Sequence, residues 1–132
     1  IRTVDVEESD LTDRAAELTA GDGFDVVIDA TGHESGVEQG ADLVRKGGVV
    51  LVVGIPDGSS DLYFPDLVRG EIDVKTSYAS LPADFQRALR LMADGIADPA
   101  TIIDESYSRD DPETAITDFL ASKTVKPVFR FD

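Results

Sequence analysis

The chain has 132 residues, the size of one ordinary domain, and 42% of them are hydrophobic, which is enough for a buried core and excludes wholesale disorder. It contains no cysteine, so disulfides, thiolate metal sites and cysteine nucleophiles are excluded. Its net charge of −15 repels phosphate backbones and anionic lipids, and no apolar run approaches the roughly 18 residues of a membrane span. We therefore expect a cytoplasmic protein that binds neither nucleic acid nor membranes.

The composition is also skewed within each charge class. Nineteen Asp accompany eight Glu, and eight Arg accompany four Lys. We interpret this acidic surface as halophilic, an adaptation to high salt that screens self-repulsion; the alternative is an acidic protein without salt adaptation. The chain begins at Ile1 and its one methionine is Met92, so we expect a piece of a longer protein.

The first elements follow from apolar spacing and capping residues. Ile1–Val6 is typical of a short strand. Asp10 is a favourable N-cap for a helix that Gly21 ends, and Phe24–Ala30 (FDVVIDA) predicts a strand. Its consecutive apolar residues, Val26–Ile28, predict cover on both faces, as in a parallel sheet between helices.

A second helix and strand follow. Ser35 and Glu38 have the spacing of a capping box, and Gly47 with Gly48 predicts the end of that helix. Val49–Val53 (VVLVV) is the most apolar segment and predicts a second buried strand.

The next stretch begins with a Gly/Pro/Ser/Asp loop over Ile55–Phe64 and one helical turn over Pro65–Arg69. Glu71–Tyr78 alternates and predicts a strand near the sheet edge. A helix is predicted from Pro82 to Gly95. Its core-facing stripe would be Phe85, Ala88, Leu89 and Met92.

The last elements are a strand over Ile102–Tyr107, a helix starting at Asp111 and Pro112, and a strand over Val125–Phe131. The buried face of that helix would be Ala115, Ile116, Phe119 and Leu120. Strands and helices alternate throughout, so the sequence predicts an α/β domain with a mostly parallel sheet.

Two predicted strands end in glycine. Asp29–Gly32 (DATG) follows the first buried strand and Val53–Pro56 (VGIP) follows the second. Ligands of open α/β sheets bind beyond the carboxyl ends of the strands, and glycine allows a sharp turn or close approach there. Glycine also punctuates ordinary loops, so this pattern alone does not decide between a ligand site and a structural turn.

Several chemical motifs are absent from the sequence. It has no Gly-x-Gly-x-x-Gly, P-loop or Gly-x-Ser-x-Gly pattern. The sole histidine, His33, is interpreted as a solvated or capping residue, and a single histidine without cysteine does not make a zinc site. The aspartates of Asp57–Asp61 and the pair at Asp110 and Asp111 lack the spacing of a calcium loop. The sequence therefore predicts no catalytic or metal-ligating residue.

Three segments resemble one family. Gly23–Gly32 (GFDVVIDATG), Leu43–Pro56 (LVRKGGVVLVVGIP) and Asp73–Ala79 (DVKTSYA) are similar to the later Rossmann strands of medium-chain, zinc-type alcohol and polyol dehydrogenases. Three further segments resemble that family's C-terminal part: Phe85–Gly95, Ala115–Leu120 and Lys126–Phe131.

The resemblance implies a partial Rossmann-like sheet flanked by helices. Residues 1–95 would be the C-terminal part of the NAD(P)-binding domain, and residues 96–132 would pack on a GroES-like catalytic domain that lies outside this chain. The glycine-rich turn, the ribose-reading acid and the zinc ligands would lie upstream. The cofactors implied are NAD or NADP, with zinc in the parent enzyme.

The resemblance also implies site residues and partners. Ala30, Thr31 and Gly32 would line the adenosine, and Val53, Gly54 and Ile55 would offer main-chain groups to the nicotinamide carboxamide. Ser77 and Tyr78 would lie near the nicotinamide ring and Lys126 near the pyrophosphate, although Pro127 departs from the family pattern. The substrate would be a small-molecule alcohol, and two subunits would join through the edge strand at residues 71–78.

The chain alone is expected to be catalytically inactive and to bind NAD(P) weakly or not at all. Two alternatives remain open at this stage. One is a stand-alone α/β interaction or regulatory module, and the other is a zinc-free quinone or enoyl reductase of the same family.

Overall fold

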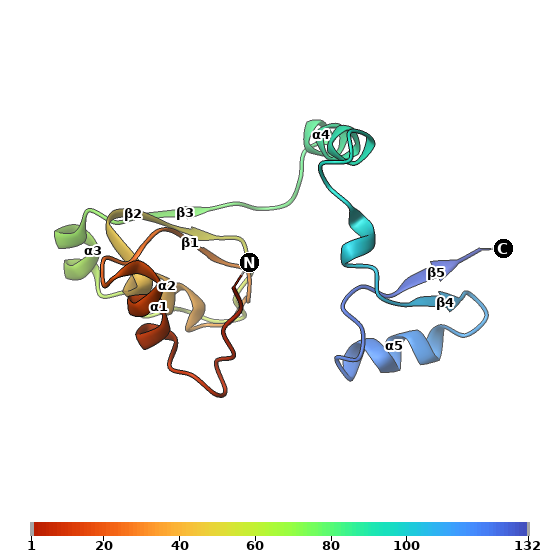
Figure 1. Cartoon of the computed structure of the whole chain (residues 1–132), viewed down its shortest axis with the longest axis horizontal. Coiled ribbons are helices and arrows are strands. Elements are labelled where there is room, and N and C mark those ends of the chain that lie inside the picture. Colours follow the sequence, from red (N-terminus) through yellow and green to blue (C-terminus); the bar gives the residue numbers. More distant parts are fainter. Residues whose placement is uncertain (1, 132) are drawn as a thin grey trace. The chain divides into compact units, whose positions relative to one another are not determined.

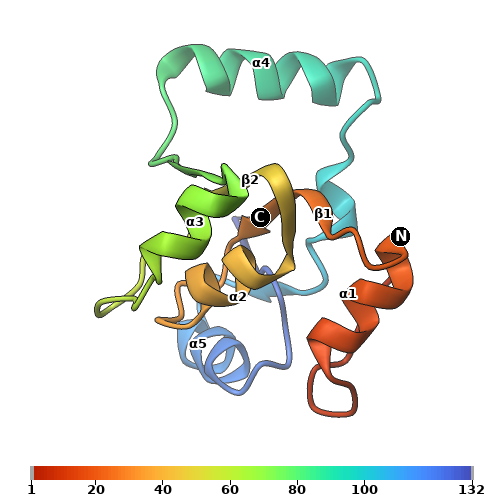
Figure 2. The ribbon, with the colours of Figure 1, turned by 90° about the vertical axis from the view of Figure 1, so that its left-hand side faces the viewer.

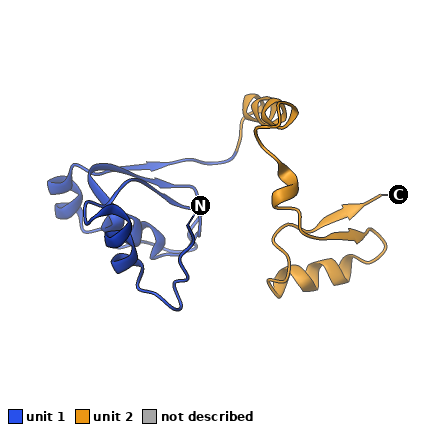
Figure 3. Ribbon diagram, in the orientation of Figure 1, with its two compact units in different colours: residues 1–79 blue, residues 80–132 orange. Residues whose placement is uncertain are grey.

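The computed structural model describes residues 2–131, which belong to two compact units, residues 1–79 and residues 80–132 (Figure 3). In the first unit a parallel sheet has the strand order β1-β2-β3 (Figure 1). The strands are β1 (Phe24–Asp29), β2 (Val44–Val52) and β3 (Asp73–Thr76). The helices are α1 (Leu11–Thr19), α2 (Gly36–Leu43) and α3 (Phe64–Gly70), whose course is clearest in Figure 2.

The core of the first unit lies between the sheet and α2. Val37 of α2 packs with Val50 and Val52 of β2, and Val50 is fully buried. Val44 completes this buried cluster, and Val27 of β1 packs against it. The predicted parallel α/β arrangement of the first unit is therefore confirmed.

The other face of β1 is open. Val26 is 52% and Ile28 is 60% exposed, so the prediction that both faces of this strand are covered is wrong for the described chain. The side chains of a strand alternate between its faces, and only the face shared by Val27 and Asp29 meets α2 and the core. A continuous apolar run shows that both faces of a strand are suited to burial. It does not show that this chain contains the helices that would pack on both faces.

Several local predictions also need correction. Residues 2–6 form no strand, and Ile1 lies outside the described residues. Gly47 and Gly48 lie inside β2 instead of ending a helix, because β2 begins at Val44 and bulges against β1, where the pairing jumps from Phe24↔Val44 to Val26↔Val49. The helix starting at Asp10 is confirmed, since the Asp10 carboxylate accepts from the amides of Thr12 and Asp13.

The second unit pairs two short parallel strands, β4 (Ser106–Ser108) and β5 (Val128–Arg130). Its helices are α4 (Pro82–Ala93) and α5 (Pro112–Leu120), with a short 3₁₀ turn at Pro99–Thr101. The predicted strand over Ile102–Tyr107 is shorter and begins later, because the 3₁₀ turn extends its last hydrogen bond to Ile102.

The apolar stripes of the second unit are largely uncovered. No residue of α4 is buried, and α5 buries Ala115 alone. Both helices are present and the predicted burial of Ala115 is confirmed, but the predicted burial of the large apolar residues of the two stripes is wrong for the described residues. The exposed members are Phe85, Leu89, Met92, Ile116, Phe119 and Leu120.

Candidate functional site

The ends of β1 and β2 lie directly against each other. Asp29, the last residue of β1, pairs with Val52, and its carbonyl accepts hydrogen bonds from the amides of Val53 (2.9 Å) and Gly54 (3.0 Å). A Cβ built on Gly54 would overlap the amide nitrogen of Gly32. The structure thus brings the two predicted glycine-ended tips together, and we call residues 30–32 and 53–55 the strand-end cradle.

Both glycines are required by this geometry. Gly32 has a φ of +69°, which favours glycine, and a Cβ there would lie 3.0 Å from the Ile55 carbonyl oxygen. At Gly54 any side chain would push the two tips apart. The cradle therefore presents main chain at close quarters, while Val53 and Ile55 on its rim are 40% and 68% exposed.

The Asp29 side chain lies beneath the cradle. It is 4% exposed, and its Oδ1 accepts from the Thr31 amide (2.9 Å) and from the Thr31 hydroxyl (2.7 Å). These bonds fix the turn that carries Ala30, Thr31 and Gly32. Within residues 2–131, Asp29 Oδ2 is the buried side-chain atom that has no hydrogen-bond partner.

The turn continues into α2 through local side chains. The His33 amide donates to the Thr31 hydroxyl (3.1 Å), and His33 Nδ1 lies 3.0 Å from the Ser35 hydroxyl. Ser35 makes no side-chain cap to α2, so the predicted capping box is wrong. Ser35 has helical backbone angles (φ −80°, ψ −7°), unlike an ordinary N-cap, and its hydroxyl accepts from Gln39.

Glu38, the other half of the predicted capping box, holds the loop after β2. Its Oε1 accepts from the Asp61 amide (2.6 Å), and the Ser60 hydroxyl donates to the Glu34 carbonyl (2.6 Å). The long polar loop after the cradle is therefore tied back to the start of α2.

The third strand adds its own tip to the same edge of the sheet. The Ser77 amide donates to the Val52 carbonyl (3.0 Å), which extends the β2–β3 pairing beyond Thr76. Tyr78 follows and is 84% exposed. Eight of the nine predicted cofactor residues thus lie at the carboxyl ends of three adjacent parallel strands.

Lys126 belongs to the second unit, in an exposed turn before β5. The Asp104 carboxylate organises this turn by accepting from the Thr124 hydroxyl (2.5 Å) and from the amides of Val125 (2.7 Å) and Lys126 (3.2 Å). The Thr124 bond, followed by the Val125 bond, lowers the pKa of Asp104 from 3.8 to about 2. Asp104 is therefore the anchor of the turn that carries Lys126.

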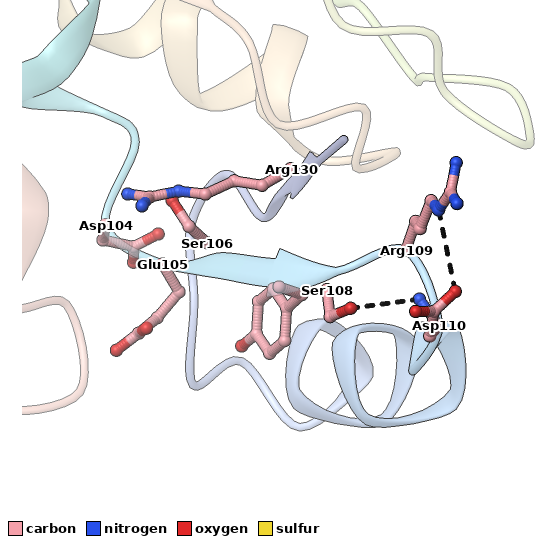
Figure 4. Close-up of a pocket in the computed structure, with 8 residues that line it drawn as sticks. Asp104, Glu105, Ser106, Ser108, Arg109, Asp110 and Arg130 are labelled. Atoms are coloured by element: carbon pink, nitrogen blue, oxygen red, sulfur yellow. Dashed lines mark hydrogen bonds and ion pairs between the residues drawn. The ribbon is translucent and has the colours of Figure 1, made fainter. Parts of the chain in front are cut away.

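A cavity of about 580 Å³ lies on the second unit, along β4 and Arg130. Figure 4 shows Arg109 and Arg130 at its two ends, with Asp104 beside the Arg130 guanidinium and the Glu105 side chain directed away from it. Arg109 is paired with Asp110 (3.6 Å). The two guanidinium groups do not converge on one point, and no predicted site residue lines this cavity, so we do not assign the cofactor to it.

The described residues provide no metal centre. Across residues 2–131, no three His, Cys, Asp or Glu side chains are grouped closely enough to hold a metal ion. In the same part of the chain no helix is both long and apolar enough to cross a bilayer.

Two carboxylates have roles that their predicted positions do not reveal. The sequence places Asp29 at the end of one strand and Asp104 inside another, whereas in the structure each anchors a turn. An acidic residue followed two positions later by threonine is a signal for an Asx-type turn at Asp29. The partners of Asp104 lie 20 to 22 residues away, so no local pattern predicts them.

The sequence of this chain is similar to those of known proteins. A family model described as zinc-binding dehydrogenase matches residues 2–94. Sorbitol dehydrogenase of Halalkalibacterium halodurans is 32% identical over 106 residues, which cover 80% of this chain and 31% of that protein. The probable D-xylulose reductase A of Emericella nidulans is 32% identical over 113 residues, 84% of this chain and 31% of that protein.

Solved structures of similar fold superpose on nearly the whole chain. The 2R,3R-butanediol dehydrogenase from Bacillus subtilis superposes with a TM-score of 0.85 at 25% identity, over 98% of this chain and 38% of that chain. The alcohol dehydrogenase TADH from Thermus sp. ATN1 shares the fold, with a TM-score of 0.87 at 20% identity, over 96% of this chain and 38% of that one. The chain thus spans about a third of the length of these relatives. On the family match and these identities, it belongs to the zinc-binding dehydrogenase family.

Proposed function

We propose that this chain is the C-terminal part of the coenzyme domain of a zinc-type, NAD(P)-dependent alcohol or polyol dehydrogenase. The full enzyme would transfer a hydride between a small-molecule alcohol and a nicotinamide cofactor. The observation that carries the proposal is the contact of two glycine-ended parallel strand tips, Gly32 against Gly54, at the carboxyl edge of the sheet.

The cradle fits half of a dinucleotide. Gly32 and Gly54 let the two tips close on each other so that the cradle presents main chain, and the rim residues Val53 and Ile55 offer apolar contact. In this proposal residues 30–32 line the adenosine, residues 53–55 meet the carboxamide, and Ser77 and Tyr78 lie near the ring. Lys126 would approach the pyrophosphate as a point charge. The bound cofactor would supply the hydride acceptor or donor.

Zinc does not fit the described residues, since none of them form a ligand group. We assign zinc to the part of the parent enzyme outside this chain. The chain alone would then be inactive. The family match ends at residue 94, which supports a domain boundary near residue 95 in the parent, although the chain itself divides after Ala79.

The edge strand β3 supports a homo-oligomer. It pairs with β2 on one side, and in the order β1-β2-β3 its other side is an unpaired edge within the described sheet. Such an edge needs cover, and a second copy of the same strand would provide it.

The test is nucleotide titration of this chain followed by amide NMR. We expect NAD or NADP at millimolar concentration to shift the amide signals of residues 30–32 and 53–55, with no turnover of any alcohol. Gly54→Ala should abolish these shifts because its Cβ meets the Gly32 amide. Gly58→Ala is the matched control, since its Cβ meets the far end of the exposed Glu34 side chain.

Two outcomes would favour the alternatives. Absence of nucleotide shifts at the cradle, both here and in the full-length protein, would favour an interaction module. Nucleotide binding by a full-length protein that contains no zinc on metal analysis would favour a zinc-free reductase of the same family.

A further inference from the structure

The strongest unassigned feature of the first unit is the buried carboxylate of Asp29. A carboxylate that is 4% exposed is costly unless hydrogen bonds replace the hydration that burial removes. Asp25, on the same strand, is exposed and pairs with Arg45 (2.7 Å). The two residues share a strand and a chemistry, but only Asp29 lies in the interior.

Asp29 joins three segments at the cradle. Its carboxylate accepts both the amide and the hydroxyl of Thr31, and its carbonyl accepts the amides of Val53 and Gly54. The side chain of Asp29 thereby holds the turn after β1, while its main-chain carbonyl holds the turn after β2.

The third segment is the first turn of α2. A Cβ built on Gly36 would lie 2.6 Å from Asp29 Oδ1 and 2.8 Å from the Thr31 hydroxyl. Gly36 is the first residue of α2, so the carboxylate packs against a helix start, where the helix dipole favours negative charge. No other residue type fits at Gly36 without displacing the Asp29–Thr31 pair.

We propose that Asp29 is the positioning residue of the cofactor site. It touches no reacting atom; it sets the spacing of the adenosine-side turn (Thr31 and Gly32) and the carboxamide-side turn (Val53 and Gly54), so that both meet one ligand. This inference rests on the proposed function, because it assumes that a nucleotide binds to both turns.

The geometry distinguishes this role from simple core filling. A core-filling residue would be replaceable by an apolar one of similar size, whereas Asp29 uses its acceptors on a turn. Asn retains one acceptor oxygen for Thr31 and places its amide group at the unpartnered Oδ2 position. Asp29→Asn should therefore weaken the turn, and Asp29→Ala should release it.

The experiment is amide hydrogen exchange by NMR on this chain, without and with NAD. In Asp29→Ala we expect the amide of Thr31 to exchange at least about tenfold faster relative to the β2 amides, the loss of about one charge-assisted hydrogen bond. Thr31→Val, which removes only the hydroxyl, should give a smaller acceleration. Asp25→Asn is the matched control and should leave the cradle amides unchanged.

A second variant covers failure of Asp29→Ala to fold. Gly36→Ala leaves every hydrogen-bonding group in place but pushes on the carboxylate, so we expect the same acceleration at Thr31. Unchanged exchange at Thr31 in both Gly36→Ala and Asp29→Asn would overturn the proposal, whatever the nucleotide does.

Nucleotide binding separates this inference from the proposed function. If wild-type chain binds NAD and Asp29→Asn weakens binding at least about tenfold while Asp25→Asn does not, the positioning role is supported. If Asp29→Asn accelerates Thr31 exchange but binds NAD as tightly as wild type, the positioning role is overturned. If neither this wild-type chain nor the full-length protein binds NAD, the proposed function fails, and the positioning role for a cofactor fails with it, even where the exchange data show that Asp29 holds the turn.

Discussion

The two units of this chain are stabilised in different ways. The first has a buried cluster of four valines, Val37, Val44, Val50 and Val52, between a three-stranded sheet and a helix. In the second the buried residues within the described chain are Ala115 and Thr124, and its apolar stripes on α4 and α5 are exposed. Its order depends on polar anchors such as Asp104 with Thr124, and Asp118 with Lys123 (2.9 Å).

This difference shows how far each unit relies on a core of its own. Three strands with a packed hydrophobic face meet the minimum for independent stability, and the first unit has them. In the second unit α5 packs with two short strands, but within the described residues Ala115 is the one apolar side chain that this packing buries. The cradle in the first unit is accordingly built on its core, through Asp29. The turn that carries Lys126 is built on hydrogen bonds alone.

The largest expected effect comes from the core of the first unit. Val50→Ala should cost about 2 kcal/mol of unfolding free energy, because Val50 is fully buried and its loss leaves a cavity. Hydrogen exchange should show the loss in β1 and β2 and leave α5 unchanged. Val74→Ala, at the position paired with Val50 but 40% exposed, is the control and should cost clearly less. Equal losses in both units would contradict the comparison.

Charge provides the next test, since it is distributed unevenly. Residues 1–79 contain seventeen acidic and six basic side chains, whereas residues 80–132 contain ten acidic and six basic ones. Screening by molar KCl should therefore stabilise the first unit more, by about 1 kcal/mol, or roughly 4–8 °C in its melting temperature. A thermal melt with probes in each unit, at low and molar KCl, measures this. Equal stability at both salt concentrations would remove the idea of salt adaptation.

The sequence predicts where the helices and strands lie better than it predicts which of their faces are buried. The three strands of the first unit and the helices that begin at Leu11, Pro82 and Pro112 follow from apolar spacing and capping residues, which act within a few residues. The exposed stripes of α4 and α5 were predicted to be buried because apolar periodicity records the burial a chain is built for. The same periodicity does not predict whether the surface that packs on the stripe belongs to these 132 residues.

The site shows the same limit. Glycines at strand ends predicted that residues 30–32 and 53–55 would meet, because parallel neighbours end at one edge. The anchors beneath them depend on contacts between distant residues, as with Asp104 and the turn at Thr124, or on burial, as with Asp29. Ser35 and Glu38 have the spacing of a capping box, but their side chains accept hydrogen bonds from Gln39 and from the Asp61 amide instead of capping α2.

Acid tests the anchor of the second unit. Because hydrogen bonds from Thr124 and Val125 lower the pKa of Asp104 from 3.8 to about 2, its contribution to stability is fully present above pH 4 and is lost as pH falls through about 2. Carboxyl NMR should place the Asp104 midpoint near 2, with the amides of Val125 and Lys126 losing protection in the same range. Thr124→Val, which removes the largest cause, should raise that midpoint toward 3.8. A wild-type midpoint near 3.8 would contradict the anchor.

The smallest expected effect tests the start of α2, where sequence and structure disagree. A capping box predicts that Ser35→Ala costs about 1 kcal/mol, whereas the observed Ser35, which caps no amide of α2, predicts a few tenths. Glu38→Ala should cost about 0.5 kcal/mol and speed exchange of the Asp61 amide, because that amide loses its acceptor. Urea unfolding with exchange at residue 61 measures both variants. If Ser35→Ala proved the costlier of the two, Ser35 would stabilise the start of α2 as a capping box predicts, and unchanged exchange of the Asp61 amide in Glu38→Ala would show that Glu38 does not hold the loop after the cradle.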